Sequence, residues 1–474
     1  MIRQGRFRIP AWESISRRVL GGNRAMNRKL AETIIRYLSF SGEVDARRGS
    51  LSGFSWRQWE HTLRWLDNAN LALYLLQKLR DNHEDRKLPP AVLSRLEQNY
   101  SNNRLRVDEM ASAFAEVNER FRRFGVNYAV VKGFSLVPGF RPDACLRQQS
   151  DLDYLVDEQS LPDAQQALGD LGFFLKEHNP AFLACDSTAR EWIFSKAPIS
   201  HSFNSSEQYE GKDRYVIELL LAIWRPEKHG ISIAGAQFSP SRTVDHEWRG
   251  MHFRALHDED AFLLQVLHTF QHLLSGDVRM SWLYEIAYCL DRRANDTLFW
   301  QRLERRTETE VLLTHFVAII AELAAQFFQA PLPAIIQTWR TNLRPSMKVW
   351  LENYGWRVAF EKIPVYELGV FPTSKLVIFL HRQFLPDDKL RRNLTRQRLL
   401  PWKRPASIVR SIRQRPAAIL DSQWRSRQLL FHRAIFHAGS GLRYLCEIPR
   451  WLWLNRSEAV REVPEISTGS TKKR

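Results

Sequence analysis

Two aspartates separated by one residue, Asp151 and Asp153, are the side chains of this sequence best suited to chemistry. They lie in an alternating segment that predicts a β-strand, so both carboxylates should project from the same face. Adjacent carboxylates repel each other unless a cation relieves the charge, and Mg²⁺ prefers such hard oxygen ligands. The pair therefore predicts a divalent metal site, although an isolated Asp-x-Asp motif is more often only a solvated pair.

The turn before this pair has the groups that a nucleoside triphosphate needs. An apolar run over residues 126–131 predicts a strand, which ends at Lys132 and Gly133. Gly133 lets the backbone approach phosphates closely, Lys132 supplies a cation, and Ser135 supplies a hydroxyl group. Arg147 could add a bidentate phosphate contact. Lys132 could instead serve only as the ion-pair partner of a nearby carboxylate.

A third carboxylate, Glu218, lies in an apolar run over residues 215–224 that predicts another strand. It could complete a two-metal arrangement that activates an acceptor hydroxyl and stabilises the departing pyrophosphate. A structural role at the edge of a strand is an equal alternative. Arg147 also has a second interpretation, because it could fix the loop that follows it by pairing with Asp151.

The elements that must position these residues change along the chain. Helical periodicity dominates residues 26–124 and returns after residue 258, whereas short strands and turns lie between them. We expect strands near residues 126–131, 150–156, 173–176 and 215–224, with a helix at 160–172. This order predicts an α+β fold. The expected divisions are a helical region at 1–124, a core at 125–250, a helical domain at 251–385 and a basic segment with a polar tail at 386–474.

The order and spacing of these motifs resemble an uncharacterised nucleotidyltransferase family of the polymerase-β-like superfamily. The motifs are a Lys-Gly turn at residues 132–133, an Arg followed by Asp-Leu-Asp-Tyr-Leu-Val at 147–156, and Leu-Gly-Phe at 171–173. The likeness extends over about residues 50–300, through an amino-terminal helix, the 217–224 strand, and the pattern of His268, His272, Trp282 and Glu285. Leu220 stands where the family has His, and Glu285 where it usually has Asp.

This resemblance implies a polymerase-β-like core, a small mixed sheet with helices, flanked by amino- and carboxy-terminal helical regions. It implies an enzyme that transfers a nucleoside monophosphate from an NTP to an unknown acceptor, with one or two Mg²⁺ ions or Mn²⁺ as cofactor. The catalytic and metal-binding candidates are Asp151, Asp153 and Glu218. The candidates for binding nucleotide and phosphate are Lys132, Gly133, Ser135 and Arg147.

The net charge of +17 is uneven, because residues 381–430 hold 13 Lys or Arg against three Asp or Glu. Such a block favours an anionic partner, and its Arg residues with Trp402 and Trp424 suit a membrane surface, a polyanion or an ordinary solvated face. The alternative to an enzyme is therefore a catalytically degenerate scaffold protein of the same fold that engages an anionic membrane or polyanion through this region.

Other features narrow the class of protein. The four cysteines have no metal-ligand or disulfide spacing, and the amino terminus lacks the apolar segment of a secretory signal. The most apolar stretch, Val311 to Ala330, holds His315 and Glu322 and predicts a buried helix rather than a transmembrane one. We expect a cytoplasmic protein, with peripheral contact at the inner face of the membrane as an option. His268 and His272 share a helix face but have no evident third metal ligand, which favours a structural role.

Overall fold

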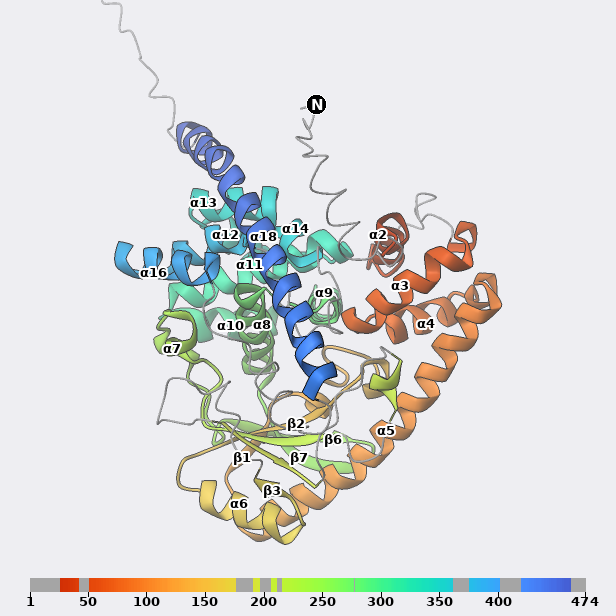
Figure 1. Ribbon diagram of the computed structural model, residues 1–474. Helices are drawn as coiled ribbons and strands as arrows, with labels where there is room; N and C mark the ends of the chain where they lie inside the picture. The colour runs from red at the N-terminus through yellow and green to blue at the C-terminus, as the bar shows by residue number, and fades with distance from the viewer. Residues whose placement is uncertain are drawn as a thin grey trace, which may run out of the picture.

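A mixed seven-stranded sheet lies at one end of the molecule and a helical body covers the rest (Figure 1). The computed structural model describes residues 26–41, 51–175, 191–196, 206–210, 215–276, 278–360, 375–400 and 419–461. The strands are β1 (Tyr128–Val130), β2 (Asp151–Val156), β3 (Phe174–Leu175), β4 (Glu191–Ser195), β5 (Val216–Leu220), β6 (Thr243–Trp248) and β7 (Met251–Leu256). The fold is α+β, as expected.

The centre of the sheet is formed by β5, β2, β1 and β7, and the full order is β3-β4-β5-β2-β1-β7-β6. Strand β2 pairs in parallel with β5 and antiparallel with β1, whereas β1 pairs in parallel with β7. The β2–β5 register places Asp153 opposite Glu218. The motif-bearing strand therefore lies between two buried neighbours, where its side chains are held in fixed positions.

The two faces of the sheet have separate cores because successive side chains on a strand alternate between faces. On one face, Tyr154 and Ile217 pack with Phe114 and other apolar residues of α5 (Pro90–Arg123) and with α6 (Leu161–Asp170). On the other face, Leu155 and Leu220 pack with Leu264 of α8 (Asp258–Ser275). Asp153 and Glu218 have the same parity as Leu155 and Leu220, so they project towards the side that α8 covers.

The amino-terminal and carboxy-terminal helices share one continuous apolar core. The amino-terminal helices are α2 (Arg28–Tyr37), α3 (Trp56–Ala69) and α4 (Ala72–Asp81). The carboxy-terminal helices are α8, α9 (Met280–Arg292), α10 (Thr297–Thr307), α11 (Val311–Phe328), α12 (Ala334–Thr341), α13 (Pro345–Trp350), α14 (Trp356–Phe360), α15 (Val377–His381), α16 (Asp388–Leu399) and α18 (Ile419–Arg461). In the sequence, the sheet domain thus lies between two parts of one helical body.

Helix α11 is the described helix that is long and apolar enough to cross a membrane, but 72% of its apolar window is buried inside the protein. It packs against α8, α9 and α12. A helix that is apolar on every side and surrounded by other helices is a core helix, as the sequence predicted. Its His315 and Glu322 are buried, and Glu322 pairs with Arg340 of α12 at 3.0 Å.

The expected strands near β1, β2, β3 and β5 are present, but β4, β6 and β7 were not predicted. The sheet continues to Leu256, and the expected division at residue 250 falls within the β6–β7 hairpin. Trp402 lies outside the described residues, and Trp424 lies in α18 at a position where no side chain is described.

Candidate active site

Three carboxylates converge at one end of the central strands. Asp151, Asp153 and Glu218 each offer an oxygen, and these oxygens lie within 4.8 Å of one another. The parallel β2–β5 register brings Glu218 beside Asp153, and the two-residue period of β2 brings Asp151 to the same face. The structure therefore brings together the three acids that were candidates from the sequence.

Among the described residues, Lys132 is the cation that pairs with this acidic group. The Nζ atom of Lys132, just after β1, lies 2.8 Å from Oδ1 of Asp153. Asp153 is only 2% exposed, whereas Asp151 and Glu218 are half-buried. A single ammonium group cannot neutralise three carboxylates, so the centre keeps an excess of negative charge in a poorly hydrated place.

The pKa values of these groups reflect that excess. Burial, followed by the carboxylates of Asp153 and Asp151, holds the pKa of Glu218 well above its ordinary value. Burial also raises the pKa of Asp153, against the opposing effect of Lys132 and with the effect of Asp151. Burial alone would lower the pKa of Lys132, but Asp153, Glu218 and Asp151 together raise it. The positive charge of Lys132 therefore does not balance the three carboxylates.

The donor set fits a divalent cation. With all three carboxylates ionised, no N–H or O–H group of the described residues donates to the buried Oδ2 of Asp153. A buried oxygen without a hydrogen-bond donor destabilises the fold. A hard cation would coordinate this oxygen and would also reduce the repulsion between the three carboxylates. Asp151, Asp153 and Glu218 could therefore hold Mg²⁺ or Mn²⁺.

The turn at Gly133 is fixed from two directions. Gly133 has a φ of +64°, and a Cβ atom at this position would collide with the side-chain amide of Gln149. Nε2 of Gln149 donates to the carbonyl of Asp151 at 2.9 Å, and Nη2 of the fully buried Arg141 donates to the carbonyl of Gly133 at 2.6 Å. Only glycine suits this conformation and close approach, so the turn keeps a set distance from β2.

Arg147 does not pair with Asp151, the alternative that the sequence allowed. Its Nη1 lies 2.9 Å from Oε2 of Glu285 on α9. Arg141 and the hydroxyl of Tyr74 also donate to this carboxylate, at 3.1 and 2.8 Å. Arg147 keeps 12% exposure of its side chain. Its charge lies near the carboxylates, because Asp151 is among the groups that raise its pKa.

Ser135, a candidate for binding phosphate, makes a local hydrogen bond instead. It lies in the short helical turn Gly133–Leu136, and its Oγ donates to the carbonyl of Lys132 at 3.2 Å. The hydroxyl thus closes the turn locally. The structure brings together Asp151, Asp153, Glu218 and Lys132, places Gly133 in the adjoining turn, and directs Arg147 and Ser135 towards other partners.

Helix α8 continues over this centre. Ala261 and Leu264 pack on the sheet beside Leu155 and Leu220, and His268 is the next residue on the same helix face. Its ring lies 4.6 Å from that of His272 and 4.7 Å from that of Trp282. Burial, and then the charge of Lys132, hold the pKa of His268 well below its ordinary value. His268 thus forms part of the wall of the site as a neutral ring.

Three residues around the site were missed by sequence reasoning. Arg141 and Gln149 lie in a loop with no pattern of its own, and each acts through a hydrogen bond to a backbone carbonyl nearby in the sequence. Glu285 was noticed only as part of a motif. The sole signal that could have found Arg141 is its position in the loop between the Lys-Gly turn and the aspartates.

Comparison with known proteins gives a family for most of the chain. A family model described as an uncharacterised nucleotidyltransferase matches residues 55–329, more than half of the chain. The matched span includes the sheet, the three carboxylates and Glu285. None of the curated proteins and none of the solved structures matches the chain.

Proposed function

This chain belongs to the uncharacterised nucleotidyltransferase family, and from that premise we propose that it transfers a nucleoside monophosphate from an NTP to an acceptor, with Mg²⁺ or Mn²⁺ as cofactor. The observation that carries the proposal is the convergence of Asp151, Asp153 and Glu218 around a buried Asp153 oxygen. With the three acids ionised, no donor among the described residues reaches that oxygen. Such a centre is stable when a cation joins it, and a metal-bound triphosphate supplies that cation.

In the proposed reaction an acceptor oxygen forms a bond to the α-phosphorus of the NTP. The bond from this phosphorus to the oxygen that bridges to the β-phosphate breaks, pyrophosphate leaves with the electron pair, and the acceptor proton passes to a carboxylate or to water. Bound divalent ions would supply Lewis-acid neutralisation of phosphate charge. Asp151, Asp153 and Glu218 would hold them.

The cations of the chain suit the triphosphate. Arg141 and Arg147 share the single charge of Glu285, so this pair of guanidinium groups carries a surplus positive charge beside the carboxylates. We propose that Arg147, the more exposed of the two, faces the phosphates and that Lys132 balances Asp153. Gly133 presents backbone to the nucleotide, and Ser135 supports that turn.

The test uses α-labelled NTPs, Mg²⁺ and cell extract, with the full-length protein as catalyst. We expect labelled product that is lost when Asp151→Asn and Asp153→Asn are combined. The matched control is Glu158→Gln, an exposed acid two residues beyond the end of β2, which should label as the parent does. Equal labelling by the double variant would overturn the proposal.

A second measurement separates the enzyme from a degenerate scaffold of the same fold. Leu220, where the family has His, fills an apolar position under Leu264. If calorimetry finds no Mg²⁺-dependent binding of any NTP to the parent protein, the protein is a catalytically degenerate scaffold. Binding that requires both Mg²⁺ and Asp151 supports the enzyme.

A further inference from the structure

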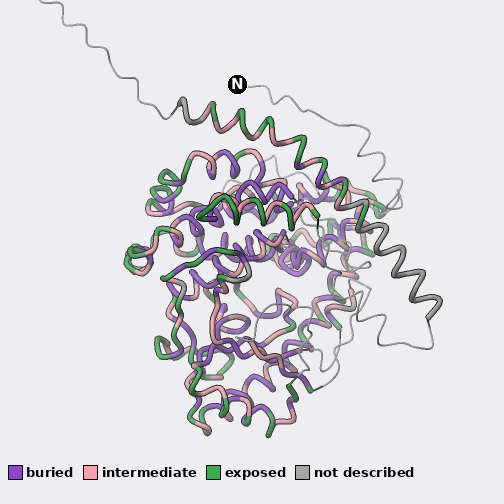
Figure 2. The backbone as a smooth tube through the Cα atoms, turned by 60° about the vertical axis from the view of Figure 1, so that its left-hand side comes forward, coloured by how far each residue is buried: buried purple, intermediate pink, exposed green. Residues whose placement is uncertain are grey.

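Helix α18 crosses the outside of the molecule (Figures 1 and 2). Its described residues turn an apolar face to solvent. Leu442, Leu445, Leu452 and Trp453 are 59%, 52%, 52% and 63% exposed. Cys446 and Pro449 are also exposed, and helical spacing places all six on one side. The side chains cover about 16 Å of helix at 1.5 Å per residue. A continuous apolar face of this kind marks an interaction site.

The opposite side of α18 is already used for packing. Tyr444 and Trp451 stack on Phe379 of α15, with ring centroids 4.7 Å apart in both pairs. Trp451 also contacts Tyr354, and Arg357 binds Glu447 at 3.0 Å. The helix is therefore held firmly by one face, and its exposed leucines are not a consequence of a loosely attached segment.

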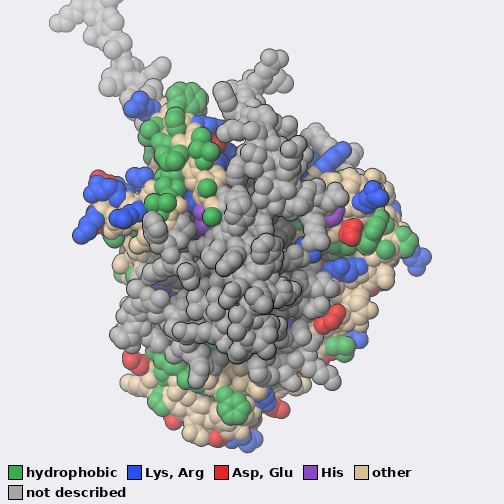
Figure 3. All heavy atoms as spheres, viewed as in Figure 1, with side chains coloured by type: hydrophobic (Ala, Val, Ile, Leu, Met, Phe, Trp, Pro, Cys, Tyr) green, Lys and Arg blue, Asp and Glu red, His purple; other side chains and the backbone are tan. Residues whose placement is uncertain are grey.

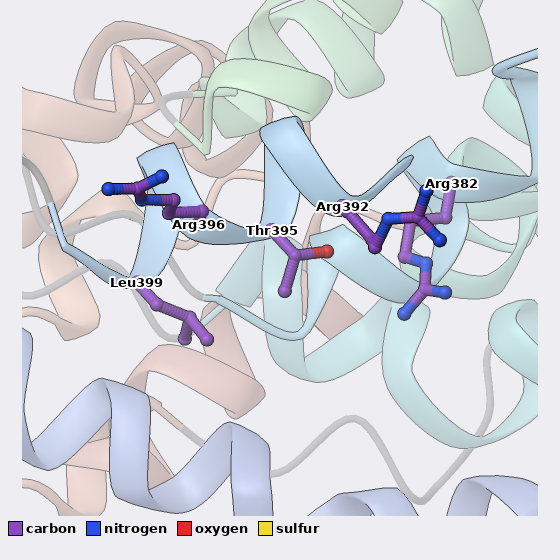
Figure 4. A pocket seen from close by; sticks show the side chains of 5 residues that line it. All are labelled: Arg382, Arg392, Thr395, Arg396 and Leu399. Atoms are coloured by element: carbon purple, nitrogen blue, oxygen red, sulfur yellow. The ribbon is translucent and has the colours of Figure 1, made fainter. Parts of the chain in front are cut away.

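Beside this apolar face, Arg382, Arg392, Thr395, Arg396 and Leu399 line a pocket of about 250 Å³ at α16. The side chains of Arg382 and Arg392 lie close together, and the Thr395 hydroxyl points towards them (Figure 4). None of the three arginines has a carboxylate partner among the residues that the structure describes. Clustered guanidinium groups without a counter-charge are suited to phosphate.

The pocket and the apolar face are physically joined. Leu399 lines the pocket, and its Cδ2 lies 3.9 Å from where a Cβ on Gly441 would be. Nζ of Lys375 donates to the carbonyls of Leu399 and His437, at 3.1 and 3.0 Å, and so ties the end of α16 to α18. Figure 3 shows apolar side chains next to the Lys and Arg side chains of α16 on one side of the molecule.

We propose that α16 and α18 form a docking surface for an anionic membrane. The leucines and Trp453 enter the boundary between headgroups and acyl chains, and the arginine pocket receives a lipid phosphate group. A lipid leaflet offers both an apolar layer and phosphate within a few ångströms, and Arg, Leu and Trp are the residues typical of helices that lie in that boundary. The cytoplasmic leaflet, with its anionic lipids, supplies the charge.

The charge distribution favours this occupant over a second copy of the chain. Helix α16 has five Lys or Arg against one Asp between its first and last residues, and none of its residues is buried. Two copies joined through this face would bring arginine-rich helices together without compensating acids. The inference does not depend on nucleotide transfer, since it concerns residues far from the carboxylates in sequence and outside the matched family span.

The test is flotation of the full-length protein with vesicles of phosphatidylcholine alone or mixed with phosphatidylglycerol. We expect binding to the mixed vesicles and its loss when Leu452→Asp and Trp453→Asp are combined. Arg382→Ala with Arg392→Ala should weaken binding about 30-fold, from about fivefold for each cation at an anionic surface. Leu298→Asp, at a position on α10 that is 67% exposed, should bind as the parent does.

Three results would overturn the proposal. The first is failure of the parent protein to bind anionic vesicles. The second is undiminished binding by either double variant, with circular dichroism showing that each variant is folded. The third is a parent dimer in light scattering that Leu452→Asp with Trp453→Asp converts to a monomer, without vesicle binding by either, which would make the face a dimer interface.

Discussion

Two clusters of buried charge lie side by side in this protein and are built in opposite ways. Asp151, Asp153 and Glu218 face one lysine among the described residues. With the three acids ionised, an oxygen of Asp153 accepts no hydrogen bond from those residues. In the neighbouring cluster, the single carboxylate of Glu285 accepts from Arg141, Arg147 and Tyr74. The first cluster has more carboxylates than cations, whereas the second has two guanidinium groups for one carboxylate.

This difference suggests that the carboxylate centre binds a ligand, whereas the Glu285 cluster stabilises the fold. Both Glu285 oxygens have donors, and the network joins α9, α4 and the loop before β2. The carboxylate centre gains its missing charge only from outside the chain. Because the surplus cations of one cluster adjoin the surplus anions of the other, a metal-bound triphosphate would complement both.

The largest effect should follow from Glu285→Gln. Removal of this charge leaves the guanidinium groups of Arg141 and Arg147 buried without compensation, so the free energy of unfolding should fall by about 3–5 kcal/mol. Urea denaturation measures this loss. The exposed control Glu158→Gln should stay within about 0.5 kcal/mol of the parent, and an equally small loss for Glu285→Gln would show that the network is not structural.

Asp151→Asn should have the opposite profile, with a large effect on activity and a small one on stability. We expect nucleotide transfer to fall by more than about 100-fold, since even residues behind the metal ligands change metal affinity or activity by 10–100-fold. Repulsion between the acids also decreases, so the metal-free protein should unfold no more easily than the parent. A strongly destabilised Asp151→Asn variant would erase the distinction between the clusters.

Gly133→Ala acts on the turn that joins the two clusters. The new Cβ would require a positive φ from alanine and would displace Gln149 from the carbonyl of Asp151. We expect a loss of about 1–3 kcal/mol in the free energy of unfolding, together with weaker NTP binding. Gly139→Ala is the control, since a Cβ there has no neighbour within 4 Å and no positive φ is needed. Equal stability of the two variants would contradict this role.

The smallest effect concerns pH in the absence of metal. Burial, with Asp153 and Asp151, raises the pKa of Glu218 above its ordinary 4.5, so the folded chain retains a proton that the unfolded chain has lost. The free energy of unfolding should therefore decline as pH rises from about 4.5 through the raised pKa. Glu218→Gln should show less of this decline in chelator-treated samples. Parallel pH profiles for parent and variant would refute the assignment.

Much of the carboxylate centre could be predicted because its residues are close in sequence or lie on apolar strands. The two-residue period of Asp151-Leu-Asp153 places both acids on one face, and Glu218 stands out as a charge within an apolar run. The partners of Glu285 could not be predicted, since Arg141 and Glu285 are 144 residues apart and no periodicity connects them. Arg147 was therefore assigned to phosphate or Asp151 rather than to Glu285.

The β6–β7 hairpin shows why part of the sheet was missed. Strand β6 is an edge strand with Asp245, His246 and Glu247, so its pattern has little apolar content. Its two-residue turn, Arg249-Gly250, has φ values of +50° and +75°. That conformation is usual for tight hairpins, but an Asn-Gly or Asp-Gly pair predicts it much more strongly than Arg-Gly does.

Binding of a divalent cation by Asp151, Asp153 and Glu218 can be measured directly. The most direct measurement is titration of the chelator-treated protein with Mn²⁺, followed by electron paramagnetic resonance of the free ion. We expect saturable binding by the parent and by Glu158→Gln, with loss of that binding when Asp151→Asn and Asp153→Asn are combined. Unchanged Mn²⁺ binding by the folded double variant, or none by the parent with or without an NTP, would contradict it.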